Sequence, residues 1–311
     1  MRVLLIVNLK SGQGDAGIYD FARELGRHGT EIVVRFVGRK QTLASMLADA
    51  KEFDRVVAAG GDGTVSGIAY ALRGSGVPIV AYPAGTANLT ALNLRIPLDP
   101  IDLAAITLRG AIRSFDLGEI SCPSQADGCV PTLATTPPDT KAQGFVVAAG
   151  IGFDAKIMEG AHELKSSIGA AAYLVAALQN LAPIVSKFHL KLDDRVVDTE
   201  GIAVLVVNFA RLQFDISITH DSDPSDGVFE IVVLRTRNAI ELLPAVWAAV
   251  LDRTTGIQVG SPGLEIYSAR DIIMSSDPPL PLQHDGETAA PVSPIHVRVL
   301  HRAATFVVPE E

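Results

Sequence analysis

Cysteine is nearly absent from this sequence, whose 311 residues contain only Cys122 and Cys129. Two cysteines with no accompanying pair of histidines make neither a zinc-binding pattern nor a disulfide framework. We interpret both as loop thiols. So little cysteine is typical of a reducing compartment, and we expect a cytoplasmic protein.

Long hydrophobic runs are absent as well. A membrane-spanning helix needs about 18 or more apolar residues, and the closest candidate, Gly169 to Val185, is interrupted by Gln179, Asn180 and Pro183. We interpret that stretch as a buried helix. The N-terminal run Val3–Val7 is too short for the core of a signal peptide, so we expect a strand there.

Positive charge is in deficit, with 26 Lys and Arg against 35 Asp and Glu and a formal net charge of -9. An acidic surface repels nucleic-acid phosphates, so we expect no nucleic-acid partner. The content of 48% hydrophobic and 20% charged residues is that of a globular protein. The length is sufficient for two hydrophobic cores.

Residues 1–113 alternate strand-like and helix-like segments. Short apolar runs, which are typical of parallel strands buried on both faces, alternate with amphipathic stretches. The predicted strands are Val3–Val7, Glu31–Phe36, Arg55–Ala59 and Val77–Tyr82, and the predicted helices are Ile18–Arg27, Leu43–Lys51 and Val65–Leu72. This order predicts a doubly wound α/β domain.

Residues 114–311 predict a second domain that is mostly antiparallel β, in the form of a sandwich. Segments rich in Val, Ile and Phe recur between turns, and some alternate as half-exposed strands do. The predicted strands are Gly144–Ala148, Phe188–Leu192, Ile202–Asn208, Val228–Leu234, Ile295–Leu300 and Thr305–Val308. We also expect helical inserts near 161–181 and 240–251, a loop insertion over 121–143, and a last strand that can return to the first domain.

The strongest local motif is Gly60-Gly61-Asp62-Gly63-Thr64, between a predicted strand and a predicted helix. Ligands of α/β proteins bind at this end of a parallel strand. The glycines allow close approach to phosphate oxygens, and the helix N-terminus favours an anion. Asp62 is a candidate for binding Mg²⁺ or accepting a proton. The alternative is a tight turn with a helix cap, although a turn rarely needs three glycines.

A second loop, Pro83–Asn88, follows the next strand. Gly85 permits close approach, the hydroxyl of Thr86 can cap a helix, and Asn88 can contact a phosphate or ribose. The third loop, Asn8-Leu9-Lys10-Ser11-Gly12, follows the first strand. It matches neither the P-loop nor the dinucleotide-binding pattern, and by itself it is as compatible with an ordinary β-α turn.

A distal acidic turn, His284-Asp285-Gly286-Glu287, lies between apolar segments. Two carboxylates around a glycine are common in surface turns, so the turn alone does not establish a site.

Together these motifs resemble the diacylglycerol kinase-like lipid kinases, a family that includes sphingosine and ceramide kinases and bacterial lipid kinases. The resemblance covers nearly the whole chain and keeps the motif order. It is carried by Gly60–Thr64, Pro83–Asn88, Ile96-Pro97, Phe115–Gly118, Gly150–Ala155, Ser225–Val228, Asp285–Glu287 and Pro309.

The resemblance implies a two-domain kinase that binds ATP between its domains and transfers the γ-phosphate to a lipid hydroxyl. Implied nucleotide contacts are Asn8, Lys10, Ser11, Gly12, Thr42, Gly60, Gly61, Asp62, Gly63, Thr64, Ser66, Gly85, Thr86 and Asn88. Glu287 would take the hydroxyl proton, with Asp285 beside it. Asp62 would serve the catalytic Mg²⁺ or the base network, which Asp116 can join. Whether Asp62 or Glu287 is the base stays open.

A second, structural Mg²⁺ is also implied, bound by the Asp226 carboxylate and the main-chain oxygens of Asp223 and Val228. The expected acceptor is a diacylglycerol, phosphatidylglycerol, polyprenol or sphingoid lipid. Peripheral contact with the inner membrane face and a homodimer are further expectations. The alternatives are an enzyme similar to NAD kinase, which has the same type of glycine loop, and a non-catalytic nucleotide- or lipid-binding protein.

The chain departs from the family pattern at three places. Leu9 stands where proline is common, and Asn88-Leu89-Thr90-Ala91 stands where Asn-Asp-Phe-Ala is usual. The stretch 208–219 lacks the glycines often found there. The last two lie near nucleotide- or acceptor-facing regions, so the acceptor can be unusual.

Overall fold

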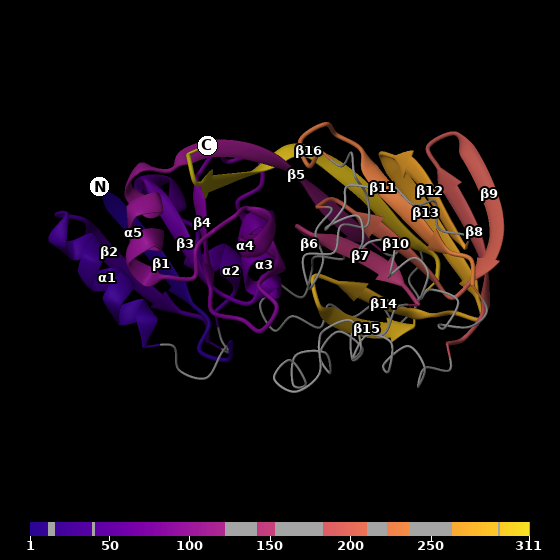
Figure 1. Ribbon diagram of the computed structural model, residues 1–311, viewed down its shortest axis with the longest axis horizontal. Helices are drawn as coiled ribbons and strands as arrows, with labels where there is room; N and C mark the ends of the chain where they lie inside the picture. The colour runs from indigo at the N-terminus through magenta and orange to yellow at the C-terminus, as the bar shows by residue number, and fades with distance from the viewer. Residues whose placement is uncertain are drawn as a thin grey trace, which may run out of the picture.

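The computed structural model describes residues 1–11, 16–38, 41–121, 142–152, 183–209, 223–236, 263–291 and 293–310. These residues form two lobes that lie side by side, and two long strands, β5 and β16, run between the lobes along one edge (Figure 1). The C-terminal strand ends beside the N-terminal lobe. None of the helices in the described ranges is long and apolar enough to span a bilayer.

The N-terminal lobe is the predicted α/β domain. Its parallel strands are ordered β2-β1-β3-β4, and every residue of the central strand β3 is buried, as apolar runs covered on both faces require. The strands are β1 (Arg2–Val7), β2 (Glu31–Phe36), β3 (Arg55–Gly60) and β4 (Ile79–Pro83). The helices are α1 (Gly17–Arg27), α2 (Leu43–Met46), α3 (Asp62–Ala71), α4 (Leu89–Asn93) and α5 (Pro100–Arg109).

Two helices of this lobe differ from the predicted bounds. The predicted helix 43–51 ends at Met46, because the Arg35 guanidinium binds the Met46 carbonyl and the Asp49 carboxylate, and only a short 3-10 turn, Ala50–Glu52, follows. Helix α3 begins at Asp62 rather than at Val65, so part of the glycine motif forms its first turn.

Strands β5 (Ala111–Ser121) and β16 (Ile295–Val308) join the lobes. Their antiparallel pairing is interrupted between Leu300 and Ala304, and beyond the interruption Phe306 lies parallel to Ile79 of β4. One sheet, with ten strands in the described ranges, therefore continues through both lobes. The proposed domain boundary at residue 113 falls inside β5 and stays a prediction.

The C-terminal lobe is the predicted β-sandwich. One layer is the distal part of the continuous sheet, with β6 (Ala142–Phe145), β8 (Ser186–Leu192), β9 (Arg195–Gly201) and β13 (Asp271–Asp277). The other is ordered β12-β11-β10-β7-β14-β15. Its strands are β7 (Ala148–Ile151), β10 (Ala203–Val207), β11 (Phe229–Leu234), β12 (Leu264–Ala269), β14 (Pro281–His284) and β15 (Glu287–Pro291). A core that includes Phe145, Phe188 and Phe229 fills the space between the layers.

The predicted strand 144–148 was wrong. The chain turns at Val146 and Val147, where β6 ends and β7 begins in the other layer. The two predicted strands 295–300 and 305–308 are a single strand, β16. The predicted helical inserts near 161–181 and 240–251 and most of the 121–143 insertion lie outside the described residues.

Close packing of the sandwich predicts that a side chain at Gly118 in β5 destabilises the fold. A Cβ at this position would overlap the ring of Phe145, which is fully buried. We expect Gly118→Ala to lower the free energy of unfolding by about 1–3 kcal/mol, measured by urea denaturation. Gly26→Ala in α1 is the control, because a Cβ there meets no atom and alanine favours a helix. Equal stability of both variants would contradict this packing.

Candidate active site

Three loops meet at the carboxyl ends of β1, β3 and β4. The Asn8 side-chain amide donates to the hydroxyl of Thr64 (2.8 Å) and accepts from the main-chain N–H of Lys10 (3.1 Å). The first loop is therefore fastened to the glycine loop. Ser11 also faces the glycine loop, since a Cβ at Gly61 would lie 4.0 Å from its hydroxyl oxygen.

The glycine loop and the Pro83–Asn88 loop pack main chain against main chain. A Cβ at Gly85 would overlap the Cα of Gly61, and a Cβ at Gly60 would overlap the side chain of Thr64. Asn88 adopts a left-handed conformation (φ 51°), and its amide both accepts from the Gly85 N–H and donates to the Gly85 carbonyl, each at 2.8 Å. Asn88 thus shapes the loop in which it was predicted to contact nucleotide.

Asp62 organises the site through main-chain contacts. Its buried carboxylate accepts the N–H groups of Leu89 (3.0 Å) and Thr90 (2.8 Å), which begin helix α4. Burial raises the pKa of Asp62, these N–H groups lower it, and the charge of Asp285 raises it further. The carboxylate therefore fixes α4 relative to α3.

Asp285 links the distal acidic turn to both lobes. Its carboxylate accepts from the N–H groups of Val146 (2.6 Å), Val147 (2.9 Å) and Ala148 (3.1 Å), and from the hydroxyl of Ser66 in α3. Burial raises the pKa of Asp285, and these four donors oppose that effect. The turn between β6 and β7 is thereby tied to the helix that follows the glycine loop.

Glu287 lies against the glycine loop. Its carboxylate is so close to Gly63 that a Cβ on that glycine would overlap it. Burial first and the neighbouring Asp285 second raise the pKa of Glu287. Among the described residues it accepts no hydrogen bond, so its oxygens are available to a ligand, unlike those of Asp62 and Asp285.

Asp116 lies at a different place, where β5 passes the interruption in β16. Its fully buried carboxylate accepts from the Arg302 N–H (2.6 Å), the Gly227 N–H (2.6 Å) and the ring of His301 (2.9 Å). It therefore holds the turn Asp223–Val228, and no described contact joins it to Glu287. In that turn the Asp226 N–H donates to the Asp223 carbonyl (3.2 Å), and the Val228 N–H donates to the Asp226 carboxylate (2.8 Å).

The remaining predicted residues have other positions. Thr42 caps α2 by accepting the N–H of Ser45 (3.2 Å), and Thr86 is exposed in its loop. Gly12 lies outside the described residues, as do residues 153–155 of the predicted motif 150–155.

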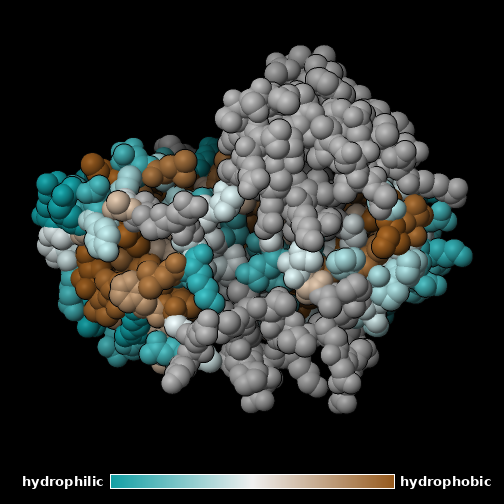
Figure 2. Space-filling model, turned by 90° about the horizontal axis from the view of Figure 1, so that it is seen from below, coloured by the Kyte–Doolittle hydropathy of each residue, from teal (hydrophilic) through white to brown (hydrophobic). Residues whose placement is uncertain are grey.

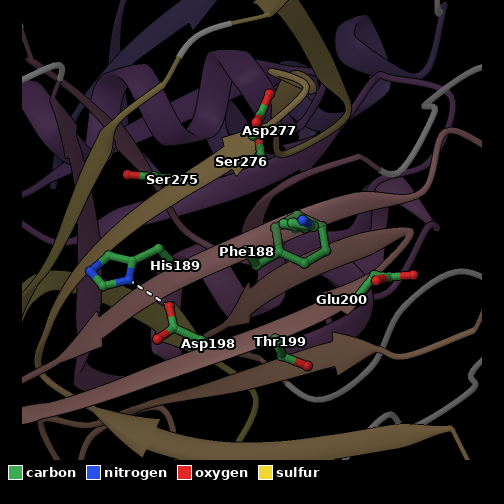
Figure 3. A pocket seen from close by; sticks show the side chains of 9 residues that line it. Phe188, His189, Asp198, Thr199, Glu200, Ser275, Ser276 and Asp277 are labelled. Carbon is green, nitrogen blue, oxygen red and sulfur yellow. Dashed lines mark hydrogen bonds and ion pairs between the residues drawn. The ribbon is translucent and has the colours of Figure 1, made fainter.

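A cavity of about 580 Å³ lies away from these loops, on β8, β9 and β13. Figure 3 shows its walls, where His189 pairs with Asp198 and Glu200 lies further along the same strand as Asp198. It shares no residue with the converging glycine loops, so we do not include it in the candidate site.

Comparison with known proteins places the chain in a family. The family model described as the diacylglycerol kinase catalytic domain matches residues 2–120, and that of the YegS C-terminal NAD kinase beta sandwich-like domain matches residues 146–308. The chain belongs to the diacylglycerol kinase-like lipid kinase family. The resemblance in the sequence motifs is thereby confirmed, and membership indicates a phosphotransferase with an alcohol acceptor.

Proteins from several bacteria are similar to this chain along most of its length. A diacylglycerol kinase of Mycobacterium tuberculosis is 26% identical over 93% of this chain and 93% of its own length. An uncharacterized protein of Synechocystis is 27% identical over 86% of this chain, which spans 58% of that protein. The fold is shared with a diacylglycerol kinase structure from Bacillus anthracis, with a TM-score of 0.69, 18% identity, and coverage of 99% and 96% of the two chains.

Sequence reasoning missed the partners of the acids in this site. The N–H groups of Val146–Ala148 carry no sequence signal, because any residue supplies them. His284, which ends β14, is 1% exposed. Strand alternation from Leu282 could have placed it on the core face, where an imidazole is unusual.

The contacts of Asp285 predict a large effect of its removal. Asp285→Ala leaves the N–H groups of Val146, Val147 and Ala148 without their acceptor, and the Ser66 hydroxyl keeps only the main-chain oxygen of Asp62. We therefore expect a loss of about 3 kcal/mol or more in urea denaturation. Ser66→Ala removes one of these bonds and should cost about 1 kcal/mol. If Asp285→Ala costs no more than Ser66→Ala, the turn is held by other contacts.

Proposed function

We propose that this chain is an ATP-dependent lipid kinase that transfers the γ-phosphate of ATP to a lipid hydroxyl, with Glu287 as the base. The supporting observation is the position of the Glu287 carboxylate, which comes from the C-terminal lobe and lies against Gly63 in the glycine loop of the N-terminal lobe. A phosphate held by that loop and a hydroxyl held by the distal lobe would meet beside this carboxylate.

The residues of the site suit phosphoryl transfer. Gly61 and Gly85 bring main chain against main chain beside the start of α3, and a helix N-terminus favours an anion such as phosphate. As the acceptor oxygen bonds to the γ-phosphorus and the bond to the leaving oxygen breaks, the hydroxyl proton passes to Glu287. An alcohol is a weak nucleophile, so a positioned carboxylate assists the attack.

The remaining acids take supporting roles in this proposal. Asp62 and Asp285 use their oxygens for main-chain N–H groups, so they position α4 and the acidic turn. Their negative charge also favours a cation close by. Bound Mg²⁺ would neutralise the phosphates during transfer.

For the second Mg²⁺ we propose the Asp223–Val228 turn. Its donors, the Asp226 carboxylate and the main-chain oxygens of Asp223 and Val228, are all oxygens, which suits a hard cation. The described residues hold no cluster of three or more His, Cys, Asp or Glu side chains fit for a metal.

The lipid acceptor also requires access to a membrane, and we propose peripheral contact through the N-terminal lobe. Hydrophobic residues gather on the face of that lobe in Figure 2 (brown, left). Separately, Leu9 is 69% exposed in the loop that also carries Lys10, and Leu98 is 76% exposed. Apolar side chains beside a lysine suit a membrane surface.

The acceptor is determined by incubating the protein with labelled Mg·ATP and one candidate acceptor at a time: diacylglycerol, phosphatidylglycerol, polyprenol, a sphingoid base, and NAD. Labelled lipid supports the proposal, and labelled NADP instead would identify an NAD kinase. Nucleotide binding without a labelled product would favour a non-catalytic protein.

Glu287→Gln should lower kcat at least a hundredfold, because the amide cannot accept the hydroxyl proton. ATP affinity, measured by calorimetry, should change little. The control is Asp198→Asn, which alters an exposed carboxylate in the cavity on β8, β9 and β13 and should keep full activity. A Glu287→Gln variant with near-normal turnover would exclude Glu287 as the base.

The same variant has a pH-dependent effect on stability. The pKa of Glu287 is raised on folding, so its contribution to stability is present below the unfolded value of about 4.3 and is lost as pH rises through the folded pKa. At a pH above the folded pKa of Glu287, the melting temperature of Glu287→Gln should therefore equal or exceed that of the native chain. A lower melting temperature would show that its effect on kcat reflects misfolding.

Magnesium binding is tested through thermal stability. Millimolar MgCl₂ should raise the melting temperature of the native chain, because a ligand of the folded state stabilises it. Asp226→Asn should lose most of this increase and Asp198→Asn should keep it, both without nucleotide. Equal increases in the two variants would place the cation elsewhere.

A further inference from the structure

His284 is a buried imidazole that has no hydrogen-bond partner within the described part of the chain. It is 1% exposed, and this lack of a partner applies to both ring nitrogens. Buried polar side chains are normally hydrogen-bonded, because leaving one unpaired costs free energy. An aliphatic residue would fill this strand position without that cost, so the histidine requires an explanation.

The hairpin places His284 directly opposite Glu287. The two residues flank the loop Asp285-Gly286, whose φ values of 44° and 84° are those of a type I′ turn. Directly opposite residues of an antiparallel pair point to the same side, with Cβ atoms about 4.5–5.5 Å apart. Two residues further along the hairpin, the next pair on this same side is Leu282 and Ala289, which belongs to the sandwich core.

Among the residues that the structure describes, the groups around this pair give Glu287 no other donor. On the other side of His284 the opposite residue is Ala149 of β7, which brings no polar side chain. The described charged groups that act here are Asp285, which acts on Glu287 from the same hairpin, and Asp62 of α3, which acts on Asp285. Both are negative, and both direct their oxygens to main-chain N–H groups.

We propose that His284 is a positioning residue for Glu287, whose carboxylate accepts the ring N–H through one bridging water. This rests on the proposed role of Glu287 as the base. A carboxylate with no fixed hydrogen bond can rotate, and a single donor restricts it to the orientation from which it meets the acceptor hydroxyl. The interaction gives the ring N–H of His284 an acceptor and the carboxylate of Glu287 a donor.

The ring is neutral in this role. Burial lowers the pKa of His284 to about 4, so at physiological pH the ring offers one N–H and one lone pair. A neutral donor stabilises the ionised carboxylate and adds no fixed positive charge beside the phosphate site. Loss of the donor should therefore raise the pKa of Glu287.

The first test is His284→Leu, with His284→Gln as the variant that keeps an N–H donor. We expect His284→Leu to melt near the temperature of the native chain, because an aliphatic side chain suits the sandwich core and offsets the hydrogen bond lost to Glu287. Its kcat should fall about tenfold with the KM for ATP unchanged, and the acidic limb of kcat against pH should move upward. His284→Gln should restore most of the kcat.

The outcomes separate positioning from packing. If His284→Leu keeps kcat within about twofold and leaves the pH limb in place, the histidine only fills space and the proposal is overturned. If the leucine variant does not fold, His284→Met replaces it under the same criteria, since methionine adapts to irregular spaces.

A double-mutant cycle tests the contact without relying on lipid kinase activity. The melting temperature is followed from pH 5 to 9 for the native chain, His284→Leu, Glu287→Gln and the double variant. The effect of His284→Leu should depend on pH when Glu287 is present and lose that dependence in the Glu287→Gln background. The same pH dependence in both backgrounds would refute the contact. Coupling without any phosphorylated lipid would instead count against the proposed function.

Discussion

The buried carboxylate of Asp285 is the constraint on which the site depends. It accepts hydrogen bonds from the main-chain N–H groups of the turn between β6 and β7 and from the Ser66 hydroxyl of α3. The sandwich, the acidic turn and helix α3 therefore share one side chain. Glu287 follows two residues later across a two-residue turn, so its position against Gly63 is set by the same contacts.

The neighbouring carboxylates of Asp62, Asp285 and Glu287 differ in the hydrogen bonds that they accept. Burial raises the pKa of all three. Asp62 and Asp285 offset that cost with N–H donors, which fixes them as structural elements. Glu287 has no such donor among the described residues, and in this region its carboxylate is the one still able to engage a substrate. The site thus combines rigid acids with one available acid.

The N-terminal lobe could be predicted from the sequence because its determinants are local. Short apolar runs bounded by glycine and proline define the strands, and Glu31–Phe36 has the same bounds in sequence and structure. The glycine loops were found for the same reason. The turn at Val146–Val147 could not be predicted, since two valines favour a strand and the acceptor that holds their N–H groups lies more than 130 residues away.

The sequence predicted which residues lie in the candidate site better than it predicted what each of them binds. A carboxylate between glycines suggests a ligand, and only the structure shows that Asp62 binds the N–H groups of Leu89 and Thr90. The sequence likewise does not show whether Asp116 binds a ligand or the main chain. Its carboxylate oxygens accept an N–H group where β16 departs from regular pairing with β5, and these two strands lie far apart in sequence.

The strands β5 and β16 determine how the two lobes can move. Because one sheet runs through both lobes, any change in their separation must bend a two-stranded ribbon, and the weakest point is the irregularity between Leu300 and Ala304, where Arg302 has a φ of 48°. Asp116 joins that point to the turn at Gly227. Whatever rigidifies the turn therefore also rigidifies the joint, so the movement of the lobes relative to each other depends on residues away from the contact of Glu287 with Gly63.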